Sequence, residues 1–151
     1  MEKTYEQIFK GYFLYTSREF LPETSGIYCV YAGTYNKNKN EVSIRKLLYI
    51  GQSENINKRL EKHECYDKWI KHLQYGESII FSYTDVSEHD LDRFEAAMIY
   101  EHKPPVNIEY VNQFPFDTTY VYTSGENILL KNYFVIKKST TKSPSYVRYR
   151  Y

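Results

Sequence analysis

The sequence predicts a domain of the α+β class. Three observations support this: segments dense in β-branched and aromatic residues alternate with polar loops, capping residues precede stretches of helical periodicity, and prolines or glycines separate the two kinds of segment. The chain has 151 residues, of which 42% are hydrophobic and 18% aromatic. It is therefore long enough and apolar enough to bury one core.

The N-terminal part is predicted to form a helix followed by a β-hairpin. Residues 4–20 place aromatic side chains near helical spacing, which favours a short helix, and Pro22 breaks the chain after it. Strands are expected over residues 26–33 and 42–51, where β-branched and aromatic residues are dense. The connecting residues 34–40 are too rich in asparagine to stay in a sheet, so the two strands should pair as a hairpin.

The rest of the chain is predicted to alternate helices with strands. Ser53 can cap a first helix, and Ser87 with Asp90 resembles a capping box that opens a later one. Pro104 and Pro105 stop this later helix. The expected helices cover residues 54–64, 66–73 and 87–102, and the expected strands cover residues 78–83, 119–122 and 132–136.

Charge is distributed unevenly along a chain whose net charge is only +1. Residues 35–75 hold nine Lys/Arg and five Asp/Glu, and residues 131–151 hold six Lys/Arg and no acid. Residues 76–110, by contrast, hold two Lys/Arg and eight Asp/Glu. This polarity predicts a face that attracts phosphate groups. The alternative, a lysine-rich surface that only aids solubility, is equally compatible with the composition.

Composition also bounds the surroundings of the protein. No apolar run approaches the ~20 residues of a membrane-spanning helix, and the N-terminus lacks the charged and apolar regions of a signal peptide. Cys29 and Cys65 form neither a disulfide framework nor a metal-binding spacing. These features predict a cytoplasmic protein with no membrane partner.

Three charged residues fall on predicted apolar helix faces. Arg59 and His63 share a stripe with Leu60, and their i,i+4 spacing makes them helical neighbours. Glu95 lies on the apolar stripe of the later helix, beside Met98. A carboxylate turned toward a core is costly unless a cation or hydrogen-bond donors satisfy it. Arg59 could satisfy it through a buried ion pair, and a metal ion could do so in a functional site.

Two tripeptides and the residues after them carry a family resemblance. Gly26-Ile27-Tyr28 and Tyr49-Ile50-Gly51 fall on the two strands of the predicted hairpin, followed in order by Arg59, His63, Glu95 and Asn107. This series resembles the GIY-YIG nuclease family over residues 25–107. The resemblance implies a small three-stranded antiparallel sheet flanked by helices. Residues 1–107 are then a nuclease core with an N-terminal helical extension, and residues 108–151 are a β-rich C-terminal extension packed on the core and ending in a basic tail.

The resemblance also implies roles for six residues. Tyr28 and Tyr49 are expected to be active-site tyrosines, with Tyr28 the best candidate for the base that takes a proton from water. A nearby cation or a proton-accepting His63 would raise the ionised fraction of that phenol. Glu95 is expected to bind one Mg²⁺ or Mn²⁺ ion. The remaining roles are contact with the scissile phosphate for Arg59, support of a tyrosine or of the nucleophile for His63, and positioning of neighbouring groups for Asn107.

The leading hypothesis for function is a metal-dependent endonuclease that hydrolyses phosphodiester bonds in duplex DNA. Because one active site cuts one strand, cleavage of both strands would need a homodimer or two binding events. The alternatives are a catalytically silent nucleic-acid-binding module, and a nuclease for RNA or single strands that stacks bases on tyrosines. The basic tail, which includes Lys142, Arg148 and Arg150, is expected either to contact phosphates or to pack as a final strand.

Overall fold

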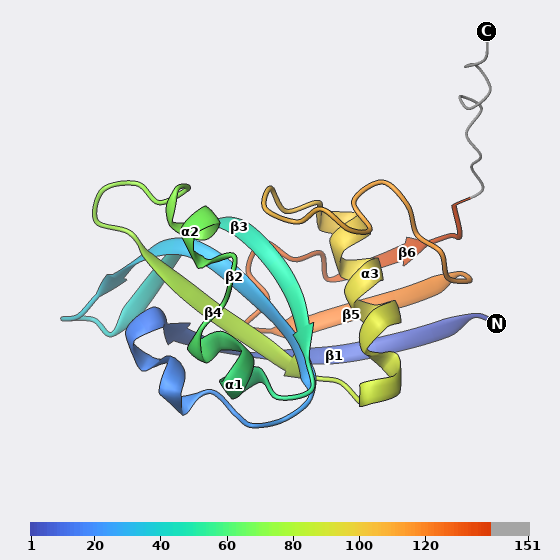
Figure 1. Ribbon diagram of the computed structural model, residues 1–151, viewed down its shortest axis with the longest axis horizontal. Coiled ribbons are helices and arrows are strands. Elements are labelled where there is room, and N and C mark those ends of the chain that lie inside the picture. Colours follow the sequence, from blue (N-terminus) through green and yellow to red (C-terminus); the bar gives the residue numbers. More distant parts are fainter. Residues whose placement is uncertain (140–151) are drawn as a thin grey trace, which may run out of the picture.

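One six-stranded sheet, in the order β3-β2-β4-β1-β5-β6, organises the computed structural model, which describes residues 1–139 (Figure 1). The strands are β1 (Lys3–Leu14), β2 (Gly26–Asn36), β3 (Glu41–Ser53), β4 (Ser78–Asp85), β5 (Thr119–Gly125) and β6 (Tyr133–Ile136). The α-helices are α1 (Ile56–Glu61), α2 (Tyr66–Ile70) and α3 (Leu91–His102), and the 3₁₀ helices are η1 (Tyr15–Phe20) and η2 (Glu88–Asp90).

The α+β class is confirmed, but the prediction of a three-stranded sheet is wrong, because the sheet has six strands. β2, β3 and β4 form the expected antiparallel group, with β2 in the middle. The additional strands come from the two ends of the described chain, β1 from one and β5 and β6 from the other. β1 joins the two groups, because it pairs antiparallel with β4 and parallel with β5.

β2 is buried on both faces from Gly26 to Gly33, which explains its unbroken apolar run. Tyr28 and Val30 belong to the core under α1 and α2, whereas Ile27 and Cys29 belong to the core under α3. The second core also takes side chains from β1, β5 and β6, so the sheet curls around α3 (Figure 1).

The N-terminal segment forms β1 and η1, so the predicted helix over residues 4–20 is wrong. The helical interpretation grouped Tyr5, Ile8 and Phe9, but Tyr5 and Phe9 are buried while Ile8 is 64% exposed. Gln7 hides the strand alternation, since this polar residue occupies the position between the two buried aromatics. Its side-chain amide donates to Thr84 Oγ1 at 2.9 Å, which satisfies it at that position.

Both short helices after the hairpin are shorter than predicted. Asn55 rather than Ser53 caps α1, because the Asn55 side chain accepts a hydrogen bond from the Lys58 N–H at 3.0 Å. The Ser53 hydroxyl instead accepts from the Asn55 N–H. α1 ends where Lys62 takes an extended backbone with φ of −154°. The chain then turns back toward the sheet at His63.

The strands expected in the C-terminal part are confirmed as β5 and β6, which continue the sheet beyond β1. The segment before β6 is tethered to α3, because the Lys131 N–H donates to His102 Nε2 at 2.9 Å. The basic-tail residues Lys142, Arg148 and Arg150 lie outside the described residues. Within residues 1–139, every helix is too short or too polar to cross a bilayer.

The strand assignment of β1 predicts different costs for two neighbouring substitutions. Phe9→Ala empties a site that is 1% exposed and should lower the free energy of unfolding by about 3–5 kcal/mol. Ile8→Ala, on the solvent face, should cost less than about 0.5 kcal/mol. Urea unfolding of both variants measures the difference. Similar losses for the two variants would contradict the strand and favour a helix that buries both side chains.

Candidate active site

Two glycines of the hairpin have no room for a side chain, and one of them gives way to a tyrosine ring. Gly51 on β3 lies opposite Tyr28 on β2, and a Cβ atom at Gly51 would lie 2.4 Å from the Tyr28 ring and its hydroxyl oxygen. Gly26 is similarly constrained, since a Cβ there would lie 2.2 Å from the carbonyl oxygen of Thr84 on β4. Only glycine fits at these two positions, and the Tyr28 ring can therefore cross β3 toward the free edge of the sheet.

The Tyr28 hydroxyl ends in a buried hydrogen bond with His63. The Tyr28 oxygen lies 2.9 Å from His63 Nε2, and Tyr28 is 1% exposed. The Cys65 N–H donates to His63 Nδ1 at 2.9 Å, so a neutral imidazole carries its proton on Nε2. Burial and the Arg59 charge lower the pKa of His63 to about 4, which keeps the ring neutral near pH 7. In this arrangement the His63 Nε2–H donates to the Tyr28 oxygen. Of the two ways of favouring the phenolate that the sequence offered, a nearby cation therefore suits this geometry better than a proton-accepting His63.

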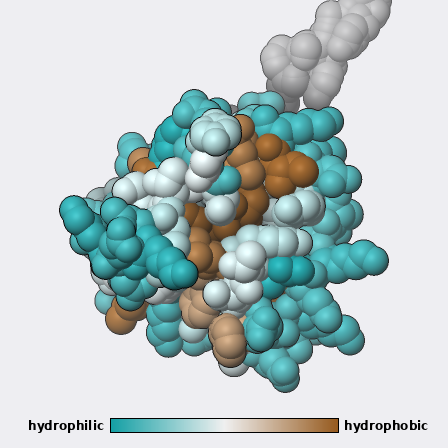
Figure 2. Space-filling model, turned by 90° about the vertical axis from the view of Figure 1, so that its left-hand side faces the viewer, coloured by the Kyte–Doolittle hydropathy of each residue, from teal (hydrophilic) through white to brown (hydrophobic). Residues whose placement is uncertain are grey.

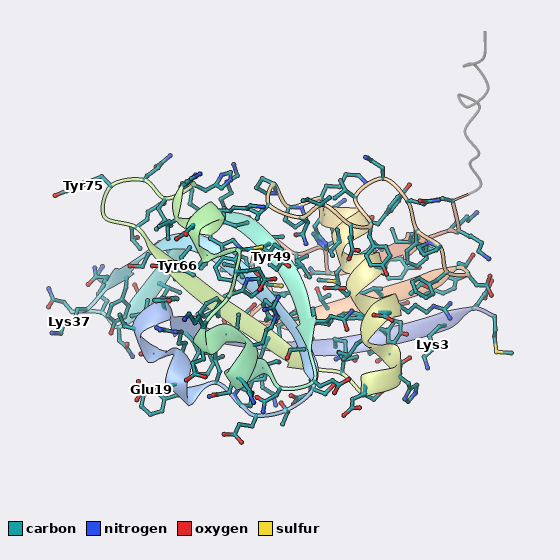
Figure 3. All side chains as sticks on the ribbon, in the orientation of Figure 1. Lys3, Glu19, Lys37, Tyr49, Tyr66 and Tyr75 are labelled. Atoms are coloured by element: carbon teal, nitrogen blue, oxygen red, sulfur yellow. The ribbon has the colours of Figure 1, made fainter. Side chains whose placement is uncertain are left out.

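Aromatic side chains enclose His63. The Tyr49 ring lies 5.4 Å from the His63 ring and 6.3 Å from the Tyr28 ring, and the buried Trp69 of α2 lies 4.5 Å from His63. Figure 3 shows Tyr49 beside β3 and below α2. Burial raises the pKa of Tyr49 to about 12 and that of Tyr28 well above its ordinary value. Both phenols are therefore protonated near neutral pH.

Arg59 reaches the same cluster, but not as a helical neighbour of His63. The chain leaves the helix at Lys62, so the predicted i,i+4 stripe does not form. His63 is buried, whereas the Arg59 side chain is 32% exposed and donates to both carboxylate oxygens of Glu64. The positive charge of Arg59 also lowers the pKa of Tyr28 and Tyr49, against the larger effect of burial. Arg59 is therefore close enough to both phenols to act on them electrostatically.

Glu95 approaches the cluster from α3 and has no cationic partner in the described part of the chain. The ion pair with Arg59 that the sequence allowed does not form. Gln52 Nε2 instead donates to Glu95 Oε1 at 2.8 Å and to Asp92 Oδ1 at 2.7 Å. Burial, with the negative charges of Asp92 and Glu109, raises the pKa of Glu95 to about 7. Since Glu95, Asp92 and Glu109 have no ion-pair partner among residues 1–139, a divalent cation suits the negative charge of this site.

Asn107 fixes the backbone between the residues of the second tripeptide. Its Oδ1 accepts from the Ile50 N–H at 3.0 Å, and its Nδ2 donates to the Ile50 carbonyl at 2.9 Å. The neighbouring Val106 N–H donates to the Leu48 carbonyl at 3.0 Å. These bonds replace a neighbouring strand along the outer edge of β3, which suits the positioning role expected for Asn107.

Two hollows adjoin the cluster. A pocket of about 140 Å³ is lined in part by Tyr49, Glu95 and Asn107. An open hollow of about 370 Å³ is lined in part by Arg59 with Lys58 and Lys62. The six predicted residues thus converge on one edge of the sheet, with an acidic side and a basic side.

Another hollow, of about 390 Å³, belongs to the opposite end of the hairpin and includes Tyr35 and Val42 among its lining. Tyr35 follows Tyr28 by seven residues along β2, which is roughly 23 Å of strand. Figure 2 faces this end of the molecule, where an apolar area is bordered by hydrophilic side chains. None of the six predicted residues lines this hollow.

Sequence reasoning missed three side chains of the cluster. Trp69 resembles an ordinary core residue, and Glu64 resembles a solvated charge on the predicted helix over residues 54–64. Gln52 could have been found, because it directly follows the second tripeptide. Strand alternation places its side chain on the face opposite the Tyr28 ring, toward the helix that carries Glu95.

The fold and the site together define a nuclease-type domain, in which a tyrosine of the hairpin and a helix carboxylate without an ion-pair partner among residues 1–139 line one pocket. The family model described as GIY-YIG catalytic domain matches residues 26–109, and the chain belongs to this family. Because the family consists of nucleases that are generally metal-dependent, the domain is a hydrolase domain whose substrate class is nucleic acid. A search of curated proteins and a search of solved structures each gave no match.

The raised pKa of Glu95 predicts a pH-dependent gain from its removal. The folded protein holds the Glu95 proton up to about pH 7, against an unfolded value of 4.5, so the ionised carboxylate destabilises the metal-free fold above pH 7. Glu95→Gln should raise the free energy of unfolding at pH 8 by about 1–3 kcal/mol, in the presence of chelator. This gain should shrink as the pH falls from 7 to 4.5.

Thermal melts at several pH values test this expectation. Glu101→Gln is the matched control on the same helix, because Glu101 is paired with Lys131 and should show no gain. A Glu95→Gln variant that is no more stable than the natural protein at pH 8 would contradict an uncompensated carboxylate.

Proposed function

We propose that this chain is a metal-dependent endonuclease of the cytoplasm that hydrolyses phosphodiester bonds in duplex DNA, using one divalent ion. The proposal extends the nuclease class of the family to particular residues of this chain. The observation that carries it is the pocket that Glu95 lines together with Tyr49 and Asn107, with the Tyr49 ring in turn packed against the His63 ring that is hydrogen-bonded to Tyr28. The thiols of Cys29 and Cys65 are free, which fits a reducing compartment.

Glu95 would hold the Mg²⁺ or Mn²⁺ ion, and Gln52 would orient its carboxylate through the bond to Oε1. When bound, such an ion supplies positive charge to a phosphate oxygen and to the departing 3′ oxygen. Asp92 and Glu109 add negative charge around the position and favour a cation there. With one principal carboxylate, binding should be weak, so activity should need about millimolar metal.

Tyr28 would take the proton of the attacking water. A free phenol is ionised in only about one molecule in a thousand at pH 7, and burial lowers that fraction further. Two neighbours favour the phenolate: the charge of Arg59 lowers its pKa, and the Nε2–H of His63 donates to its oxygen. Activity should therefore rise with pH.

Arg59 would bind the scissile phosphate, because a guanidinium offers paired donors that match two phosphate oxygens. Asn107 would keep the backbone between Tyr49 and Gly51 in place while substrate binds. A single copy has one such site and would cut one strand. Two copies acting as a homodimer would cut both.

A cleavage assay on duplex DNA, single-stranded DNA and RNA tests the proposed function. With about millimolar Mg²⁺ or Mn²⁺, duplex DNA should be cut, and chelator should stop the reaction. Glu95→Gln should bind DNA and not cut it. Binding without cleavage of any substrate would identify a silent module, and a strong preference for RNA or single strands would identify that kind of nuclease.

Hydroxyl deletions assign the base. Tyr28→Phe keeps the ring and removes the hydroxyl, so turnover should fall by about 10²–10⁴ with little loss of binding. Arg59→Ala should lower turnover by about 10²–10³ through lost charge stabilisation. The matched control is Tyr31→Phe on the same strand, because the buried Tyr31 hydroxyl has no hydrogen-bond partner among the described residues. A larger loss for Tyr49→Phe than for Tyr28→Phe would assign the base to Tyr49, which lines the pocket.

A further inference from the structure

The guanidinium expected to bind phosphate is already engaged by a carboxylate. Arg59 Nη1 donates to Glu64 Oε1 and Nη2 donates to Glu64 Oε2, each at 2.7 Å. The two parallel bonds raise the pKa of Arg59 and lower that of Glu64 to about 2. Both groups therefore carry full charge near neutral pH.

A carboxylate in this geometry reproduces the contact that a phosphate would make. The planar guanidinium presents its N–H donors as a rigid fork, which accepts two oxygens of a carboxylate or two oxygens of a phosphate in the same way. A backbone phosphate that approaches the terminal edge of Arg59 would meet the position that Glu64 now fills. The two contacts on that edge exclude each other.

The fold does not depend on the Glu64 side chain. Its side chain is 67% exposed, and exposed ion pairs contribute little to stability. The two residues that flank Glu64 hold this turn by hydrogen bonds of their own: His63 is hydrogen-bonded to the Tyr28 hydroxyl, and the Cys65 N–H donates to His63 Nδ1. Glu64 can therefore leave Arg59 while the turn and the aromatic cluster stay in place.

The surroundings of the ion pair suit an approaching nucleic-acid backbone. Arg59 lines the open hollow of about 370 Å³ together with Lys58 and Lys62. Both lysines are exposed, and within residues 1–139 neither takes part in an ion pair. A strand entering this hollow would meet the two lysine ammonium groups as well as Arg59.

We propose that Glu64 is a removable placeholder that holds the phosphate-binding fork of Arg59 in the free protein, and that a backbone phosphate of the substrate takes its place. This inference rests on the proposed function, because it assigns Arg59 to the substrate phosphate. The placeholder keeps the guanidinium oriented and also weakens binding, since each binding event must break the Arg59–Glu64 pair. Glu64 thus sets substrate affinity without touching the reacting atoms.

Binding of a fluorescein-labelled duplex DNA in chelator tests this proposal without cleavage. Glu64→Gln should bind about three- to fivefold tighter than the natural chain at low salt, because Arg59 is released and one repulsive charge is removed. The logarithmic salt dependence of binding should steepen by about one, since in the natural chain the displaced Glu64 carboxylate takes up a counterion and offsets one of those released from the DNA.

Glu54→Gln is the matched control. Glu54 lines the same hollow and has the same charge, but it does not bond to Arg59. Glu54→Gln should tighten DNA binding less than Glu64→Gln does. This difference should vanish when each substitution is made separately in an Arg59→Ala background. Equal tightening by the two variants, with Arg59 present, would show that Glu64 acts only through its charge and would overturn the proposal.

Kinetics separate a placeholder from a fixed support of Arg59. For a placeholder, Glu64→Gln should lower KM about three- to fivefold and leave kcat within about twofold. A fall in kcat with unchanged KM would mean that Glu64 orients Arg59 in the reaction, and the proposal would be wrong. Failure of the proposed function looks different: the natural chain would cut no nucleic acid, while Glu64→Gln would still bind duplex DNA more tightly than Glu54→Gln.

Discussion

The crossing of the Tyr28 ring over Gly51 is the constraint on which the rest of the site depends. Because a Cβ atom at Gly51 would overlap the ring, the tyrosine of one strand can reach the outer edge of the next. Its hydroxyl then meets His63, whose position requires α1 to end early and the chain to turn back through an extended residue. The edge itself is held by Asn107 rather than by another strand. The absence of a side chain at Gly51 is therefore what allows the hairpin tyrosine to reach the residue that follows α1.

The sequence predicted those parts of the site that follow from local rules. The two tripeptides lie on a hairpin, and Glu95 projects from an apolar helix face, as periodicity indicated. Local rules failed where a distant partner decides the outcome. Gln7 interrupts the apolar alternation of β1, and only its hydrogen bond to Thr84 on β4 explains why a polar residue is tolerated there. The parallel pairing of Lys3 with Thr119 likewise cannot be predicted from the residues around Lys3. The helical spacing of Arg59 and His63 was misleading for the same reason.

Electrostatically the site is divided. On one side of the tyrosines, Asp92 and Glu95 share the donors of a single glutamine and have no ion-pair partner among residues 1–139, and burial raises the pKa of Glu95 to about 7. On the other side, Lys58, Arg59 and Lys62 line an open hollow, and Arg59 is paired with Glu64. Among residues 1–139, neither the Glu95 carboxylate on one side nor the Lys58 and Lys62 ammonium groups on the other have an ion-pair partner.

The parallel pairing of β1 with β5 has a consequence for the order of events during synthesis. β1 can pair with β4 as soon as residue 85 has left the ribosome, which completes the hairpin core, but its other edge has no partner until residues 119–125 emerge. During that interval the nascent chain exposes a strand edge with buried-type aromatics on one face, the kind of surface that pairs with other chains. A translation product that stops before β5 should therefore aggregate through this edge, in addition to being incomplete. β5 therefore covers the exposed edge of β1 only after the residues of both tripeptides have been synthesised.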